Sequence, residues 1–524
     1  MTVLDLTIIF GYLVGIVLFG VWFARKQKTT RDYFLGDRSV PWWAVAASIV
    51  ATETSTITFI SVPGIAFSRG GNFQFLQLVF GYLLGRIVIS LLFIPSYFRG
   101  DLMTVYQLLD RRFGGKIKVL AASLFVIMRN IADGIRLLLT AIVLAAVYTS
   151  FQPGANADAI IIGSVILIGL AMIIFTYFGG MEAVIWVEVI QLGIYIIGAI
   201  AAAIILINSI DGGLSAAIAT GTQYDKFSLF DFSFDLSKTF TFWAGLIGGC
   251  FLTMSTHGTD QYLVQRYLCT DRPKRAAAAL LTSGAVVLGQ FIGFLFIGVL
   301  LFAFYKPYAD PGYAAAASGA FPFTGGDRVF PDFITRHMPP GLSGLVVAAI
   351  FAAAMSSSLN SIAATAMNDL YKPWRSGRSD QHYLKVSHVL TLVWGVVQIL
   401  VAVVLMKQNR SALDMALSVA SLINGPILGV FLVGVFLKRV GQTPALIGMI
   451  VSLTVMLCVY LAGVESGAWP VQLAHTIFPF RIAWPWYVLF GSVITLIVAW
   501  LASFAFEPAP KDRRDELAPR AVVD

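Results

Sequence analysis

The stretch Ala51-Thr52-Glu53-Thr54-Ser55-Thr56-Ile57-Thr58 lies in the middle of an otherwise apolar segment that runs from about residue 41 to residue 68. The segment is long enough to cross a lipid bilayer as one helix. One carboxylate and five hydroxyl groups at this depth are costly unless they face a buried polar cavity. A helix broken there exposes backbone carbonyls and half-helix ends, which bind cations and small solutes in transporters. The stretch therefore predicts a broken membrane helix with a transport site.

The composition places the chain among membrane proteins that cross the bilayer many times. Hydrophobic residues make up 58% of the 524 residues and charged residues only 12%, whereas soluble domains are about 25% charged. At about 20 residues per span, we expect thirteen transmembrane helices and no separate soluble domain. The predicted spans are residues 4–24, 41–68, 73–97, 117–149, 158–178, 183–208, 239–264, 275–306, 341–369, 384–406, 412–437, 442–463 and 484–506. The predicted fold class is an all-α polytopic membrane protein embedded in a lipid bilayer.

Membrane topology explains the net charge of +8 better than nucleic acid binding does. With the N-terminus outside and the C-terminus in the cytoplasm, most Lys and Arg residues of the loops fall on the cytoplasmic side, as the positive-inside rule requires. We therefore expect a multi-pass protein of a bacterial-type inner (plasma) membrane. The three cysteines, Cys250, Cys269 and Cys458, are scattered and odd in number, which argues against a disulfide framework.

A second interruption is expected in the span 239–264, where three glycines precede a polar run from Thr253 to Gln261. Transporters often carry two repeats with an interrupted helix at the same position in each. Five helices per repeat reverse the direction of the second repeat, so we expect a five-plus-five inverted repeat. The predicted units are a first helix with a basic cytoplasmic loop (1–40), the two repeats (41–208 and 239–437), two C-terminal helices (442–506) and a cytoplasmic tail (507–524).

Several strings of this sequence resemble the sodium:solute symporter family, which includes sodium-coupled carriers of sugars, proline, sialic acid and vitamins. The strings follow the family's order and extend over about residues 1–440. They are Thr30–Gly36, Thr176–Gln191, Gly258–Tyr267, Phe351–Ser361 and Asn368–Tyr371. The resemblance implies an inverted-repeat fold of the leucine-transporter type, alternating access, and Na+ as the coupling ion.

The resemblance also implies a main sodium site between the second and the ninth predicted helix. Hard cations such as sodium prefer oxygen ligands. Carried over residue by residue, the implied ligands are the backbone carbonyls of Ala51, Thr54 and Ala353 and the hydroxyl groups of Ser356 and Ser357. The string in the ninth helix is three residues shorter than the family's, which is nearly one helical turn. This difference leaves open which serines face the ion.

Glu188 stands where some members of this family have an aspartate beside a second sodium ion. Its carboxylate could bind a second ion, carry a proton, or pair with a buried arginine, and the residues do not decide among these roles. We expect one sodium ion per transport cycle.

The resemblance to sialic acid carriers also suggests residues that contact the solute. It places Ser55, Thr58 and Gln77 at substrate positions, and it places an arginine for the substrate carboxylate in the region of Arg136. Arg136 follows Asp133 by three residues, so these two side chains can also form an ion pair on one helix face.

Glu53 is a further candidate for contact with the solute, because it stands where sialic acid carriers have a neutral residue. Its carboxylate could bind a substrate amine, take up a proton, or pair with His257 or Arg136. Arg86 and Arg129 are further charges within predicted spans, and we expect them to be paired or to snorkel rather than to act as ligands.

The sequence therefore favours a sodium-driven symporter of a small polar organic solute such as a sugar, an amino acid or an organic acid, with no obligate protein partner. A proton-coupled carrier on the same fold and a solute sensor or facilitator are the alternatives. An enzyme is not expected, because the five histidines show no metal-ligand spacing and no nucleophile motif is present.

Overall fold

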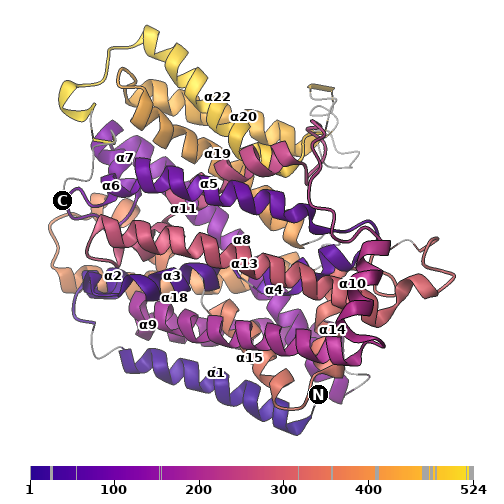
Figure 1. The fold of residues 1–524 in the computed structure, drawn as a ribbon. Helices are drawn as coiled ribbons and strands as arrows, with labels where there is room; N and C mark the ends of the chain where they lie inside the picture. Colours follow the sequence, from indigo (N-terminus) through magenta and orange to yellow (C-terminus); the bar gives the residue numbers. More distant parts are fainter. Residues whose placement is uncertain are drawn as a thin grey trace.

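The computed structural model describes residues 2–23, 27–54, 56–152, 154, 156–316, 318–355, 358–406, 412–462, 471, 476–477, 481–514 and 516–517. All regular elements in these ranges are helices, which pack into one bundle (Figure 1). The long helices are α1 (Val3–Phe23), α5 (Leu76–Leu92), α8 (Gly115–Phe151), α9 (Ala157–Ser209), α13 (Pro273–Tyr305), α18 (Asp380–Leu405), α19 (Ala412–Phe436), α20 (Gln442–Ala462) and α22 (Tyr487–Ala502). The shorter helices are α2 (Thr30–Leu35), α3 (Trp42–Glu53), α4 (Thr56–Phe67), α6 (Ile94–Tyr97), α7 (Tyr106–Phe113), α10 (Gly213–Gln223), α11 (Gly249–Gly258), α12 (Gln261–Leu268), α14 (Val329–His337), α15 (Leu342–Met355), α16 (Leu359–Thr365) and α17 (Lys372–Trp374).

The length and apolarity of these helices fit a membrane protein. Among the described residues, seven helices are long and apolar enough to cross a membrane, and the bent pair of α3 and α4 is an eighth candidate. Helix α9 covers two predicted spans, because it continues through a kink at Gly180, where φ is +60°. The all-α polytopic fold class is confirmed, whereas the number of thirteen spans stays a prediction.

In the described part of the chain, two apolar segments are interrupted by a short non-helical break. The axes of α3 and α4 are bent by 56° at the break that follows Glu53. Helices α11 and α12 are separated at Thr259 and Asp260, and the Asp260 side chain accepts a hydrogen bond from the backbone N–H of Tyr262. These two breaks confirm the interruptions that the sequence predicts.

The interrupted helices lie inside the bundle. Helix α13 packs against α3, α4 and α5, while α9 packs against α1, α3 and α15. Helices α19, α20 and α22 form a layer along one edge of the bundle (Figure 1). Irregular backbone within a membrane is tolerated only where protein or a water-filled cavity surrounds it. Thr54 and Asp260, which lie at the two breaks, are accordingly buried.

Helices α5 and α11 approach each other backbone to backbone. A Cβ atom on Gly81 of α5 would overlap the carbonyl oxygen of Gly245, which lies in the π-helical turn that leads into α11. A Cβ atom on Gly249 would come within 2.6 Å of the carbonyl oxygen of Leu78. Small residues permit such close packing between membrane helices.

We expect Gly81→Ala to destabilise the protein, because the added methyl group forces α5 away from the turn at Gly245. Overpacking of this kind costs about 1–3 kcal/mol. Gly289→Ala is the control, since a Cβ atom on Gly289 meets nothing within 4 Å. The measurement is the thermal unfolding midpoint of the purified variants in detergent. Equal midpoints for the two variants would contradict the close approach.

Candidate functional site

A cavity of about 350 Å³ lies beside the breaks between α3 and α4 and between α11 and α12. Side chains from α5, α8, α13 and α19 complete its wall. Phe75, Leu78 and Phe291 form part of an apolar lining, and the polar or charged residues of the wall include Glu53, Thr58, Arg129, Arg136, His257, Tyr262, Ser421 and Asn424. A largely apolar cavity with a few convergent polar groups is the usual form of a small-molecule site.

Glu53, the last residue of α3, contacts two side chains from other helices. Its Oε1 atom accepts a hydrogen bond from Nη2 of Arg86 in α5 and contacts Nε2 of His257 in α11. Its Oε2 atom is buried and has no hydrogen-bond partner among the described residues. Of the pairings that the sequence leaves open, the structure therefore shows the one with His257 rather than the one with Arg136, and it adds Arg86.

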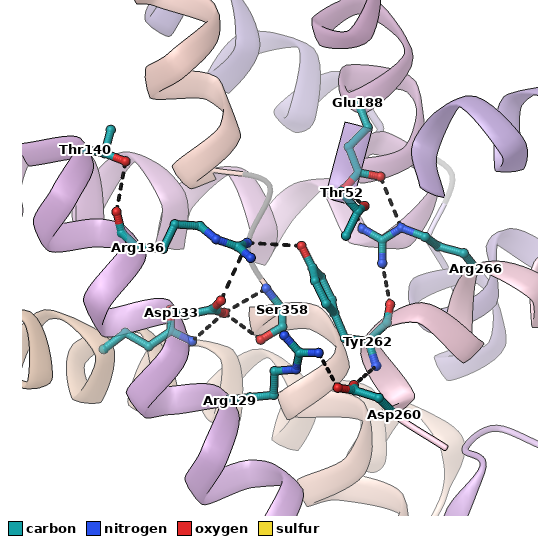
Figure 2. A network of polar contacts seen from close by, with 11 residues as sticks. Thr52, Arg129, Asp133, Arg136, Thr140, Glu188, Asp260, Tyr262, Arg266 and Ser358 are labelled. Carbon is teal, nitrogen blue, oxygen red and sulfur yellow. Dashed lines mark hydrogen bonds and ion pairs between the residues drawn. The ribbon is translucent and has the colours of Figure 1, made fainter. Parts of the chain in front are cut away.

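Arg129 and Arg136 bring two guanidinium groups of α8 to the cavity wall (Figure 2). Arg129 forms an ion pair with Asp260, and Nη1 of Arg136 donates a hydrogen bond to the hydroxyl group of Tyr262 at 3.2 Å. The Cζ atoms of Arg129 and Arg266 lie 4.6 and 4.5 Å from the centroid of the Tyr262 ring, within the range of cation–π attraction. Tyr262 thus holds several cationic side chains together at one side of the cavity.

Asp133 and Arg136 form the ion pair that their spacing of three residues predicts. Nη1 of Arg136 lies 3.6 Å from Oδ1 of Asp133. The other carboxylate oxygen, Oδ2, accepts hydrogen bonds from the backbone N–H and the hydroxyl group of Ser358, at 2.9 and 2.5 Å (Figure 2). Asp133 therefore connects the cavity arginine to Ser358, the residue that precedes α16.

Comparison with known proteins identifies the family. The chain matches the model of the sodium:solute symporter family over residues 33–452. The chain belongs to the sodium:solute symporter family. The sodium/sialic acid symporter SiaT of Proteus mirabilis is 33% identical to this symporter over 87% of this chain and 89% of its own. The sodium/sialic acid symporter NanT of Aliivibrio fischeri is 32% identical over 86% of each chain.

Solved structures agree with this assignment. The substrate-bound, outward-open structure of a Na+-coupled sialic acid symporter covers 97% of this symporter and 99% of its own chain, with 30% identity and a TM-score of 0.81. Mhp1, a nucleobase-cation-symport-1 family transporter, shares the fold at 12% identity, with a TM-score of 0.54 over 93% of this chain and 97% of its own. The leucine-transporter type of fold is therefore confirmed. The protein is a sodium-coupled solute symporter and not an enzyme, with Na+ as the coupling ion.

The described residues of the predicted sodium site lie at helix ends. Ala51 is in the last turn of α3, Thr54 follows that helix, and Ala353 is in the last turn of α15. The last carbonyls of a helix have no partner within it, so the carbonyl groups of these three residues are suitably placed for a cation. Ser356 and Ser357 lie outside the described residues. The sodium site of this symporter thus stays a prediction.

The predicted solute contacts differ in their positions. Thr58 lines the cavity, where its hydroxyl group donates a 2.8 Å hydrogen bond to the carbonyl oxygen of Glu53. Gln77 is not part of the cavity wall in this structure: its amide group donates to the carbonyl oxygen of Phe240 at 3.3 Å and accepts from the backbone N–H of Asp231 at 3.0 Å. Ser55 lies outside the described residues. Roles for these three residues in solute binding stay predictions.

Glu188 in α9 is fully buried against Arg266 of α12. Two nitrogen atoms of the Arg266 guanidinium group donate hydrogen bonds to the two carboxylate oxygens of Glu188. The hydroxyl group of Thr52 donates to Oε1 of Glu188 at 3.0 Å (Figure 2). Pairing with a buried arginine, one of the three roles that the sequence leaves open, is therefore present, while a role of Glu188 in binding a second ion or a proton stays a prediction.

The cavity wall includes polar residues that are not predicted from the sequence, among them Ser421 and Asn424. Oγ of Ser421 and Nδ2 of Asn424, both in α19, are buried without a hydrogen-bond partner among the described residues. Their spacing of three residues places them on one face of the helix. A polar pair in an otherwise apolar span is the signal that could have found them.

We expect Glu53→Gln to lower the thermal stability of the symporter, because Arg86 then keeps a buried charge without its carboxylate. Removing one partner of a buried pair costs about 3–5 kcal/mol, whereas removing one partner of an exposed pair costs about 0–1 kcal/mol. The matched control is Asp271→Asn, which breaks the exposed pairs with Arg272 and Arg275. The double variant Glu53→Gln/Arg86→Met should recover part of the loss, as measured by thermal unfolding. A Glu53→Gln protein as stable as the control would contradict the buried pair.

Proposed function

We propose that the solute of this symporter is a small organic anion with several hydroxyl groups, such as an acidic sugar. The main support is Arg136. Its guanidinium group lines the cavity, forms one side-chain hydrogen bond, to Tyr262, and lies 3.6 Å from Asp133. Arginine binds a carboxylate through two parallel N–H donors. In the described part of the chain, Tyr262 and Asp133 are the acceptors that the Arg136 side chain faces, so its other N–H donors suit the carboxylate of a solute.

Hydroxyl groups of the solute bind to polar atoms at the cavity wall that have no partner in the described part of the chain. These atoms are Oε2 of Glu53, Oγ of Ser421 and Nδ2 of Asn424. A buried polar atom without a partner costs free energy, so a solute that supplies hydroxyl and carbonyl groups removes this cost on binding. Sialic acid, the solute in the names of two relatives, is a carboxylated sugar with several hydroxyl groups. Ser55, Thr58 and Gln77 are further solute contacts in this proposal.

One sodium ion accompanies the solute, with the carbonyls of Ala51, Thr54 and Ala353 and the hydroxyl groups of Ser356 and Ser357 as its ligands. The position of the three carbonyls at helix ends supports this site, and so does α9, which packs against both α3 and α15. The assignment of the two serines rests on the sequence resemblance. The pairing of Glu188 with Arg266 supports a single ion, because the carboxylate already has a cationic partner.

Binding of sodium and solute together favours the occluded conformation, so that the inward sodium gradient drives uptake. The protein lies in a bacterial-type inner membrane with its N-terminus outside and its C-terminus in the cytoplasm. The excess of basic residues in the predicted cytoplasmic loops supports this orientation. Helix α1 begins at the end of the bundle that carries α10 and α14, whereas α22 ends at the opposite end, as an odd number of spans requires (Figure 1).

Thermal stabilisation by solutes tests the proposed function. Sialic acid, pyruvate, glucose and proline are each added to the purified symporter in sodium and in potassium salt. We expect the two net anions, sialic acid most strongly and pyruvate to a smaller extent, to raise the unfolding midpoint in sodium only, because a ligand of the folded state stabilises it. Equal stabilisation in both salts would favour a proton-coupled carrier or a facilitator. Stabilisation by glucose or proline alone would contradict an anionic solute.

The variant Glu53→Gln is expected to change which solutes stabilise the protein, whereas its affinity for sodium should stay the same.

We expect the double variant Ser356→Ala/Ser357→Ala to lose the sodium dependence of uptake into proteoliposomes, because two of the five proposed oxygen ligands are removed. Ser452→Ala is the control, since Ser452 is a buried serine whose hydroxyl group donates to the carbonyl oxygen of Gly491. Thermal unfolding of both variants checks that they fold. Sodium-driven uptake near the wild-type rate in the double variant would rule out this sodium site.

A further inference from the structure

The two carboxylate oxygens of Asp133 have different neighbours. Oδ2 accepts hydrogen bonds from the backbone N–H and the hydroxyl group of Ser358, and Nε2 of Gln398 lies 3.4 Å away. Oδ1 has no hydrogen-bond partner among the described residues and faces only Nη1 of Arg136, at 3.6 Å. Asp133 itself is almost completely buried, with 2% of its surface exposed.

Arg136 stands between this carboxylate and the cavity. Its side chain lines the cavity wall and its second contact is the hydroxyl group of Tyr262. The structure gives Asp133 no other cationic partner in the described part of the chain. The negative charge of Asp133 therefore depends on the same guanidinium group that is available to a solute carboxylate.

A buried negative charge is stable only when a positive charge lies near it. When a solute carboxylate binds Arg136, two anions share one guanidinium group, and the charge of Asp133 is less well neutralised. A further cation close to Asp133 then becomes favourable. Asp133 contacts Ser358, which directly follows in sequence the two serines proposed as sodium ligands.

We propose that Asp133 couples the binding of the solute anion to the binding of sodium by this balance of charge. The proposal rests on the proposed carboxylate solute. Sodium raises the affinity for the solute because it compensates Asp133 when Arg136 turns to the solute, and the solute raises the affinity for sodium by the same factor. Asp133 is thus a positioning and charge-balancing residue that touches neither cavity nor solute.

Asp133→Asn is the variant that tests this coupling. Its side-chain oxygen can still accept hydrogen bonds from Ser358, so the variant removes the charge and keeps the contact. Two controls accompany it. Ser452→Ala removes a buried serine hydroxyl group that donates to the carbonyl oxygen of Gly491, and Thr140→Ala removes the hydrogen bond to the carbonyl oxygen of Arg136 (Figure 2).

The experiment measures the dissociation constants of sialic acid and pyruvate by calorimetry in sodium and in choline chloride. For the wild type and both controls we expect sodium to strengthen binding by roughly tenfold or more, within the usual range of about 5- to 150-fold for coupled sites. For Asp133→Asn we expect sodium to strengthen solute binding by less than about threefold. The effect of the solute on sodium affinity, measured with and without sialic acid or pyruvate, should fall by the same factor.

The outcomes separate the two proposals. If sodium has no effect on carboxylate binding to the wild type, the proposed function is wrong and the coupling role of Asp133 falls with it. If the wild type shows the sodium effect and Asp133→Asn keeps it, only the role of Asp133 is wrong. The uncharged methyl ester of sialic acid gives a test on the wild type that needs no folded variant. Its binding should depend on sodium less than that of the acid, and an equal dependence would overturn the proposal.

Discussion

Pairing of buried charges is the constraint on which the arrangement of this symporter depends. Glu53 with Arg86, Glu188 with Arg266 and Arg129 with Asp260 each join two helices that are distant in the sequence. An unpaired charge in the interior of a membrane protein is too costly to keep, so each pair determines which helices lie next to each other. Glu53 of α3 also contacts His257 of α11, so α3, α11 and α12 all take part in these charged contacts around the cavity.

The same pairing gives the cavity its chemical character. The guanidinium groups of Arg129 and Arg136 each have a carboxylate partner, so the wall does not attract anions as strongly as two free arginines would. An anion that enters must share a cation with the protein. In the coupling proposed for Asp133, such a site binds an anion well only when another cation arrives, which is the behaviour that a symporter needs and a simple binding protein does not.

The sequence predicts the helices and their breaks well, because apolar length and polar interruption are local properties of the chain. The break after Glu53 is one example. The partners of the charged residues are a different matter. Glu53 and Arg86 are 33 residues apart, and Arg86 reaches the carboxylate because α3 and α5 both pack against α13. Gln77 shows the same limit, since its hydrogen bonds to a distant loop do not follow from its position at the start of a predicted helix.

The contact of Gly81 with Gly245 also determines how this protein can move. Two helices whose backbones interlock cannot slide along each other unless they first separate. Helix α5 and the turn before α11 therefore travel as one rigid body, and sliding must take place at their outer surfaces, where side chains rather than backbones meet. The alternation between the two sides of the membrane thus has fewer independent moving parts than the number of helices suggests.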